Sequence, residues 1–425
     1  MSLAGTLEKL YARRRFGIRP GTDRVRFLLE RLGHPERTFR TIHVVGTNGK
    51  GSTSAFLSAI LSSASYCTAL FTSPHLVSFT ERFRCNDRDI TVEQLTPLLE
   101  TVLSYAPEEA TFFEIVTALG ALCFAEERVE VAVMEAGMGG RSDASAAIPG
   151  IMTVITPISL DHSDYLGTTL AEIATEKAGI AEAGTPMVTA RQTPEVLEIL
   201  LNRSAAGGNR TVVAGDDFTS AWSHDGTLDY RGIHATLSGI RSGIPGRYQT
   251  GNAGLALAAA EVLDGIGFPV SHEAMSNGLS SAHWPGRMEL IAGQPSILLD
   301  GAHNPAGAAA LAAALDDYRY HRLLLVAGIM ADKDSAGIFS ILAPKVHRAY
   351  SVTPAVERAL GDTSLAACLS RIGIETRACG SVVNGIAAAR HDAGEGDLIL
   401  VCGSLFTVGE AKAWLTKTPF QGIRG

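Results

Sequence analysis

Residues 41–53 have the sequence Thr-Ile-His-Val-Val-Gly-Thr-Asn-Gly-Lys-Gly-Ser-Thr, in which a β-branched run leads into a glycine-rich turn. A helical pattern follows from Ser52 to about Ser63, so we expect a strand, a loop and a helix in that order. Glycines let backbone N–H groups surround phosphate oxygens, and the helix N-terminus adds positive potential. Lys50 is placed to reach the β and γ phosphates of a nucleotide, and Ser52 to face Mg²⁺.

The glycine-rich turn differs from the common phosphate-binding loop in its spacing. Two residues rather than four separate the first glycines, and Gly51 stands directly after Lys50, where Ser or Thr is usual. A connector with one exposed lysine is the alternative interpretation. The order of strand, loop and helix favours phosphate binding.

The rest of the chain alternates between apolar runs and helical patterns, which predicts parallel sheets wrapped by helices. Strands are expected at 67–71, 129–134, 151–156 and 187–190, and helices at 92–103, 112–127, 170–180, 194–201 and 249–263. A hairpin or small antiparallel excursion is expected within 211–240, around Asp225-Gly226. A second series has strands at 297–299, 323–326, 347–352 and 398–401, with helices at 306–315 and 405–414.

Gly293, Gln294 and Pro295 interrupt both series, so we place a domain boundary near 291–296. We therefore expect an α/β fold with an N-terminal nucleotide-binding domain at 1–292 and a smaller, Rossmann-like α/β domain at 297–425.

Composition restricts the partners and the compartment. The 425 residues are 46% hydrophobic and 19% charged, and 36 Lys and Arg against 44 Asp and Glu give a net charge of -8. No basic run is present to follow a nucleic acid, and no apolar stretch has the roughly 18 to 20 residues needed to span a membrane. Six scattered cysteines without a CxxC pair favour a reducing compartment and no structural zinc. We expect a cytoplasmic protein.

Several polar residues follow predicted strands, at the edge of an α/β sheet where ligands bind. Glu135 ends an apolar strand and is a candidate Mg²⁺ ligand, or else an exposed strand-end acid. His162 follows another strand, as a second metal ligand or a hydrogen-bonding loop residue. Lys177 ends a helical pattern, where a lysine commonly extends into solvent.

Two further candidates lie around the predicted boundary. Asp300 begins the turn Asp-Gly-Ala-His-Asn-Pro at 300–305, which fits ligand contact by Asp300 and His303 or a helix-capping turn. Arg287 is placed to clamp a phosphate or to form a surface salt bridge.

Together these segments resemble the folylpolyglutamate synthase and dihydrofolate synthase family, a branch of the ATP-dependent Mur ligase superfamily. The resemblance runs nearly end to end. Its residues are 42–52, Thr72-Ser-Pro-His-Leu76 with Glu81-Arg82, Phe113-Glu114, 135–143, Leu160-Asp-His162, 176–180, Gln249 with Asn252, 284–287, 299–305, Met330-Ala-Asp-Lys333 and Gly403-Ser-Leu405.

The resemblance implies an ATP-driven ligase that adds L-glutamate to dihydropteroate, to the γ-carboxylate of tetrahydrofolate, or to both, through an acyl phosphate. Phosphorylation gives the carboxylate a leaving group, while Mg²⁺ and Lys50 offset the charge between two anions. Catalytic roles are implied for Lys50, Glu135, His162 and Lys177.

Carried over by position, the resemblance implies three sets of binding residues. The ATP contacts fall on Thr47, Asn48, Gly49, Lys50, Gly51, Ser52, Asn252, Arg287, Asp300 and His303. The ligands of two Mg²⁺ sites fall on Ser52, Ser73, Glu135, His162 and Lys177, the lysine being carbamylated in the family. The substrate pocket falls on Thr22, Asp23, Arg24, Val25, Ser73, Pro74, His75, Thr111, Phe112, Ser142, Asp143 and Ala144. K⁺ is an expected activator, and a monomer is expected.

The chain departs from the family pattern at two places. Residues 141–146 have Arg-Ser-Asp-Ala-Ser-Ala where the family has Arg-Leu-Asp-Ala-Thr-Asn, and Asp87 replaces the glycine that usually follows Asn86. Two alternatives stay open. One is a muramyl-peptide-type ligase with another carboxylate substrate, and the other is a non-catalytic nucleotide-binding homologue.

Overall fold

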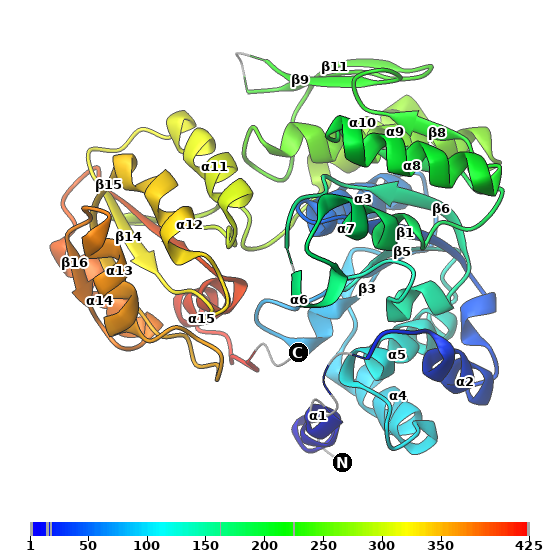
Figure 1. The fold of residues 1–425 in the computed structure, drawn as a ribbon, viewed down its shortest axis with the longest axis horizontal. Helices are drawn as coiled ribbons and strands as arrows, with labels where there is room; N and C mark the ends of the chain where they lie inside the picture. The colour runs from blue at the N-terminus through cyan, green and yellow to red at the C-terminus, as the bar shows by residue number, and fades with distance from the viewer. Residues whose placement is uncertain (1–2, 14–16, 18, 162, 224–225, 423–425) are drawn as a thin grey trace.

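The computed structural model describes residues 3–13, 17, 19–161, 163–223 and 226–422. These residues form two α/β units (Figure 1). The first unit holds an eight-stranded sheet made of β1 (Arg40–Val45), β2 (Thr68–Phe71), β3 (Phe83–Cys85), β4 (Arg88–Asp89), β5 (Val131–Glu135), β6 (Gly150–Ile155), β7 (Met187–Thr189) and β8 (Thr211–Val213). The second unit holds a six-stranded sheet made of β12 (Glu289–Ile291), β13 (Ser296–Leu299), β14 (Leu323–Ala327), β15 (Val346–Ser351), β16 (Thr376–Ala378) and β17 (Leu398–Cys402). The predicted α/β fold with parallel sheets is confirmed.

Helices cover both faces of the first sheet, whose order is β4-β3-β2-β5-β1-β6-β7-β8. The helices of this unit are α1 (Leu3–Tyr11), α2 (Asp23–Arg31), α3 (Lys50–Ser63), α4 (Val92–Tyr105), α5 (Phe112–Glu126), α6 (Ser163–Leu166), α7 (Leu170–Ala178), α8 (Pro194–Gly207), α9 (Gln249–Gly265) and α10 (His272–Ser281). In β5, Val131 and Val133 pack toward α3 and α9, whereas Ala132 and Met134 pack toward α5. Burial on both faces explains why these strands are continuous apolar runs.

A three-stranded antiparallel sheet extends the first unit. It is formed by β9 (Thr219–Trp222), β10 (Leu228–Arg231) and β11 (Thr236–Ile240), and Gly226 lies between its first two strands. This confirms the antiparallel excursion, although Asp225 lies outside the described residues. The excursion begins later than expected, because 211–213 form β8, which pairs in parallel with β7 of the main sheet.

The second sheet has the order β12-β13-β17-β14-β15-β16 and is also covered on both faces. Its helices are α11 (Pro305–Ala314), α12 (Ser335–Leu342), α13 (Asp362–Arg371), α14 (Val382–Asp392) and α15 (Leu405–Thr416). β12 precedes the predicted boundary at 291–296, yet it pairs antiparallel with β13. The division into domains at 1–292 and 297–425 stays a prediction. It would assign β12 to the N-terminal domain, although β12 is a strand of the second sheet.

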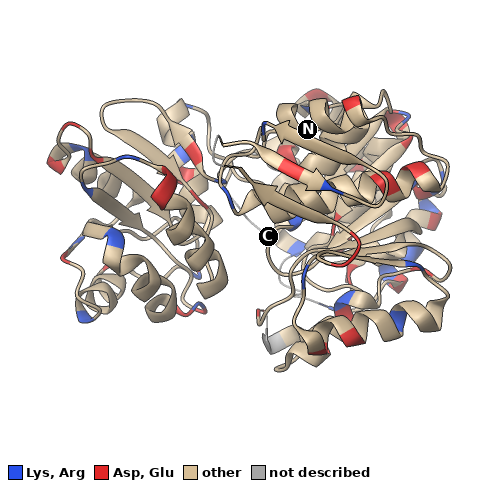
Figure 2. Cartoon of the chain, turned by 90° about the horizontal axis from the view of Figure 1, so that it is seen from above, with Lys and Arg blue, Asp and Glu red and all other residues tan. Residues whose placement is uncertain are grey.

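The carboxyl ends of the parallel strands in the two units face each other. Asn304, after β13, donates from Nδ2 to Oδ1 of Asn48, after β1, at 2.9 Å. Lys333, after β14, pairs with Asp161, after β6, at 2.8 Å. Lys and Arg are interspersed with Asp and Glu over both units (Figure 2). In the described part of the chain, no helix is both long and apolar enough to cross a membrane.

Candidate active site

The glycine-rich loop connects β1 to α3, as the sequence predicts. Gly49 has φ +89° and caps α3, which begins at Lys50 rather than at Ser52. A Cβ on Gly49 would lie 2.3 Å from Oδ1 of Asn252, and a Cβ on Gly46, at φ +142°, would lie 2.0 Å from Oγ1 of Thr156. The loop therefore depends on glycine for both conformation and space, and its backbone forms a cradle of the kind that binds phosphate.

The Lys50 side chain folds back over this loop. Its Nζ donates to the carbonyl oxygens of Gly46 and Thr47, at 3.2 Å each. Thr47 anchors the loop by donating from Oγ1 to the carbonyl oxygen of Ser159 at 3.0 Å. Ser52 is buried in the first turn of α3, which also contains Gly51. A positive charge, a hydroxyl and free helical N–H groups thus meet at one helix N-terminus, where anions bind favourably.

Glu135 ends β5 as a buried carboxyl group. The backbone N–H of Ser73 donates to its Oε2 at 3.2 Å, so these two predicted metal ligands lie together. Burial raises the pKa of the Glu135 carboxyl group, and the positive charge of Lys50 opposes that rise. A cation bound beside Glu135 would remove the cost of burying its negative charge.

Lys177 lies buried on α7, and its Nζ donates to the carbonyl oxygen of Met138 at 2.7 Å. Burial lowers the pKa of the Lys177 amine to about 7, and the charge of Lys50 adds to this effect. The interpretation of Lys177 as a solvent-exposed helix-end lysine is wrong. His162 lies outside the described residues.

The oxygen donors near the glycine-rich loop suit a hard cation such as Mg²⁺. Glu135 supplies a carboxylate, and Ser52 and Ser73 supply hydroxyls. Within the described residues, no three or more His, Cys, Asp and Glu side chains gather into a metal-binding group. The prediction that His162 and Lys177 add ligands to this set stays a prediction.

The second unit contributes Asp300 at the end of β13. The Asp300 carboxylate accepts hydrogen bonds from the backbone N–H groups of Met288 and Ala302 and from the hydroxyl of Tyr248, at 2.9 to 3.0 Å. Burial raises the pKa of the Asp300 carboxyl group, against the charge of Arg287. A Cβ on Gly301 would lie 1.9 Å from Nη1 of Arg287, so the arginine lies tightly against this turn.

His303 follows Asp300 on the same turn and is half-buried, at the wall of the cavity. Its Nδ1 lies 2.8 Å from the carbonyl oxygen of Gly301, so this nitrogen carries the proton and Nε2 is left as an acceptor. Burial lowers the pKa of the His303 imidazole. Asp300, His303 and Arg287 therefore lie on neighbouring backbone, opposite the glycine-rich loop across the Asn48–Asn304 contact.

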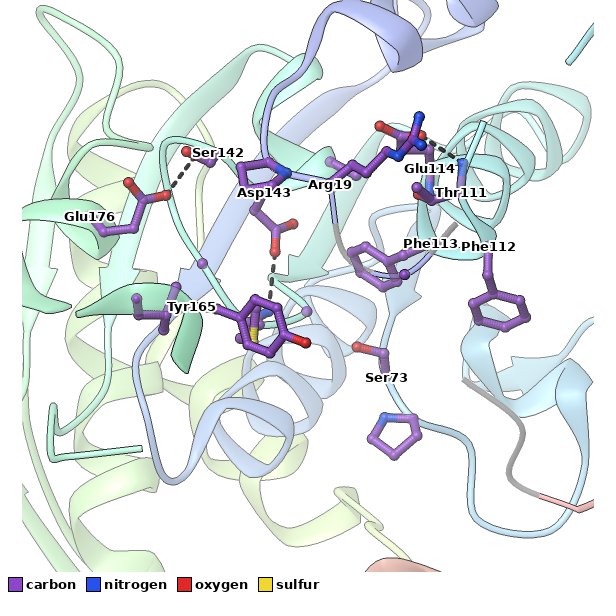
Figure 3. Close-up of a pocket in the computed structure, with 18 of the residues that line it drawn as sticks. Arg19, Ser73, Thr111, Phe112, Phe113, Glu114, Ser142, Asp143, Tyr165 and Glu176 are labelled. Carbon is purple, nitrogen blue, oxygen red and sulfur yellow. Dashed lines mark hydrogen bonds between the residues drawn. The ribbon is translucent and has the colours of Figure 1, made fainter. Parts of the chain in front are cut away.

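A cavity of about 1080 Å³ opens where the two sheet edges meet. The first unit lines it with residues after β2 and β5 and from α5 to α7, and the second unit with residues after β13, β14 and β17. Figure 3 shows Ser73, Phe112, Ser142 and Asp143 around it. Seven predicted substrate residues line this cavity: Ser73, Pro74, Thr111, Phe112, Ser142, Asp143 and Ala144.

The other predicted substrate residues are not part of the cavity wall. Thr22 and Asp23 begin α2, and Val25 is buried in the core. Arg24 lies behind the wall, where its Nε donates to Oε1 of Glu114 at 2.8 Å. His75 is buried and bonded to Arg82, whose side chain does line the cavity.

Several lining residues lay outside the predicted site. Glu114 was visible in the sequence as the acid of a capping box with Thr111. Glu176 accepts from the backbone N–H of Ser142 at 2.7 Å (Figure 3). Tyr165, Arg82 and the second-unit cations Lys333 and Arg358 also line the cavity, and only tertiary structure brings them there.

Comparisons with known proteins agree with this architecture. Residues 44–260 match the Mur ligase middle domain, and residues 286–405 match the Mur ligase, glutamate ligase domain. The dihydrofolate synthase/folylpolyglutamate synthase of Bacillus subtilis is 36% identical over 80% of this chain and 82% of that protein. A probable bifunctional folylpolyglutamate synthase/dihydropteroate synthase of Halobacterium salinarum is 38% identical over 95% of this chain and 51% of that protein. The chain thus spans about half the length of that relative, and likewise of a Haloferax volcanii protein, at 50%.

Solved structures extend the similarity to the whole fold. A Mycobacterium tuberculosis folylpolyglutamate synthase complexed with ADP superposes with a TM-score of 0.90 at 32% identity, covering 98% of this chain and 99% of that one. A Yersinia pestis bifunctional folylpolyglutamate synthase/dihydrofolate synthase complexed with AMPPNP and a Mn ion gives 0.87 at 30% identity, covering 98% of each chain. The chain therefore belongs to the Mur ligase family and, within it, to the dihydrofolate synthases and folylpolyglutamate synthases.

Proposed function

We propose that this chain is an ATP-dependent ligase that joins L-glutamate to dihydropteroate, to the γ-carboxylate of tetrahydrofolate, or to both. One observation carries the proposal. A phosphate cradle and a large cavity both lie at the facing carboxyl edges of two parallel sheets. Two residues of the cavity wall adjoin the cradle's surroundings, since Ser73 donates to Glu135 and His303 precedes Asn304, which donates to Asn48, so a nucleotide and an organic acid can be held next to each other. The relatives' names supply the substrate class.

In the proposed reaction, a carboxylate oxygen of the acid attacks the γ-phosphorus of ATP, and ADP leaves. The amine of L-glutamate then attacks the acyl carbon, inorganic phosphate leaves and an amide forms. Lys50 moves from the loop carbonyls to the transferring phosphoryl group and offsets its charge. A bound Mg²⁺ would neutralise phosphate charge at Ser52, Ser73, Glu135 and His162. The remaining ATP contacts are assigned to 47–52, Asn252, Arg287, Asp300 and His303.

Lys177 is proposed to react with CO₂ and become a carbamate. Carbamate formation requires a neutral amine, and the lowered pKa of Lys177 supplies one near neutral pH. The reaction forms an N–C bond between the neutral amine and CO₂ and releases one proton, and it converts the amine into an anionic oxygen ligand. Such a ligand would suit the hard cation proposed beside Glu135.

The remaining properties of the whole protein are also proposals. Its partners are small molecules, namely ATP, L-glutamate and the acid, and we propose a monomer in the cytoplasm with K⁺ as an activator. Contacts between Asn48 and Asn304 and between Asp161 and Lys333 join the units around the cavity, so closure of the two units should complete the site.

The test is ADP release by the purified protein with ATP, Mg²⁺ and L-glutamate. The acid is either 7,8-dihydropteroate or tetrahydrofolate. ADP release with either acid supports the proposal and assigns the step, and release with both defines a bifunctional enzyme. Silence with both acids would refute the proposal and direct attention to another carboxylate substrate.

A further inference from the structure

Arg82 brings a buried positive charge to the cavity wall. It ends the 3₁₀ helix η3 (Phe79–Arg82), and its side chain is 1% exposed although the residue lines the cavity. The faces of Phe79 and Phe112 flank the guanidinium carbon, which lies 5.6 and 5.4 Å from the two ring centroids. Phe112 is itself a lining residue, so the guanidinium lies beside the aromatic part of the wall.

One nitrogen of the Arg82 guanidinium donates a hydrogen bond, and another has no hydrogen-bond partner among the described residues. Its Nε donates to Nδ1 of His75 at 2.9 Å. Its Nη2 is buried and has no hydrogen-bond partner among the described residues. Burial lowers the pKa of Arg82 only to about 10, so the group stays charged at neutral pH. An unpaired buried cation is costly, and an anionic ligand would remove that cost.

His75 holds the guanidinium in a fixed orientation. The Nε of an arginine carries a hydrogen and can only donate, so Nδ1 of His75 carries no hydrogen and the imidazole is neutral. Nδ1 then accepts from Arg82, and Nε2 donates to the carbonyl oxygen of Gly422 at 3.0 Å. Gln421 fastens this C-terminal segment by accepting from the backbone N–H of Phe79 at 2.8 Å. These contacts therefore hold the guanidinium, and with it the unpartnered Nη2 of Arg82, in one orientation.

We propose that Arg82 binds the carboxylate of the acid substrate, the same carboxylate that takes up the γ-phosphoryl group. Arg82 lies close to the carboxyl end of β5, because its carbonyl oxygen accepts from the backbone N–H of Thr72 at 3.1 Å and the N–H of the next residue, Ser73, donates to Glu135. In the proposed reaction a carboxylate and a phosphate would meet beside this strand end, and the charges of Arg82 and Lys50 would offset their repulsion. The planar guanidinium suits a carboxylate better than a lysine ammonium would. This inference rests on the proposed function.

The experiment measures how Arg82 discriminates an acid from its neutral analogue. Dissociation constants for pteroic acid and for its primary carboxamide are measured with the wild-type chain, Arg82→Gln and Arg82→Lys, by titration calorimetry without ATP. We expect the wild type to prefer the acid by about 100-fold, and Arg82→Gln to lose nearly all of that preference. Arg82→Lys should retain part of this preference, because lysine keeps the positive charge but lacks the planar guanidinium that can donate two parallel hydrogen bonds to a carboxylate.

Two controls separate binding from folding. Arg84→Gln removes an arginine that pairs with Asp89 away from the cavity and should leave the preference unchanged. ADP affinity reports whether Arg82→Gln keeps its fold. His75→Phe, which removes the orienting acceptor of Arg82 and the hydrogen bond to Gly422, should lower the preference partway.

The outcomes distinguish the two proposals. Equal weakening of acid and carboxamide binding by Arg82→Gln would show that Arg82 serves only to shape the wall, for example by balancing Glu135, and would overturn the inference alone. Wild-type protein that binds neither compound would overturn the proposed function and, with it, the role of Arg82.

Discussion

Replacement of Lys177 by methionine tests whether a neutral lysine is buried in the site. The pKa of the Lys177 amine is about 7 in the folded chain, against 10.5 as its ordinary value. Between these two values the unfolded chain holds one more proton than the folded chain. The free energy of unfolding of the wild type therefore rises with pH in this window, by up to about 1.4 kcal/mol per pH unit.

Methionine keeps much of the side-chain length but does not titrate. The wild-type free energy of unfolding should therefore rise by about 2 kcal/mol between pH 7 and pH 9, relative to that of Lys177→Met. Loss of the hydrogen bond to Met138 shifts the variant equally at every pH and does not affect this difference. The measurement is urea unfolding at several pH values, with EDTA present and CO₂ removed.

A matched control is Lys417→Met, because Lys417 is exposed at the end of α15. Its difference from the wild type should be constant between pH 7 and pH 9. Adding bicarbonate should change the wild-type profile but not that of Lys177→Met if the carbamate forms. A constant difference between wild type and Lys177→Met over pH 7 to 9 would refute the reasoning that burial keeps this amine neutral.

Three further substitutions test the nucleotide side of the site. Gly49→Ala forces an alanine into the left-handed backbone region and places its methyl group against the side chain of Asn252, so the affinity for a fluorescent ATP analogue should fall by about tenfold or more. Gly251→Ala, in open space on α9, should leave this affinity unchanged. Lys50→Met should abolish ADP release without altering the circular dichroism spectrum, and unchanged turnover would remove Lys50 from the mechanism. Asp300→Ala leaves three buried donors unpaired and should lower the free energy of unfolding by about 3 kcal/mol, with a smaller loss for Asp300→Asn; a loss under about 1 kcal/mol would contradict its buried bonding.

Strands were predictable because the parallel sheets are buried on both faces. Expected strands at 41–45, 151–156 and 398–401 agree with β1, β6 and β17 to within about one residue at each end. Short strands at or next to the sheet edges were not predictable in the same way. β3, β4 and β12 have only two or three residues each, and pairing with a neighbour rather than a local pattern makes them strands.

The local sequence determined the α/β fold and the motifs at strand ends, because period, turn chemistry and glycine conformation act over a few residues. The local sequence therefore predicts the glycine-rich cradle before Lys50, the carboxyl group of Glu135 at a strand end, and the turn that begins at Asp300. Tertiary structure alone decided which distant groups meet. His75, which accepts a hydrogen bond from Arg82, in turn donates one to Gly422, some 347 residues farther along the chain. Lys333 likewise pairs with Asp161, 172 residues away in sequence. Burial likewise decided the charge of Lys177, since a side chain's pKa depends on the solvent and charges around it and not on its neighbours in sequence.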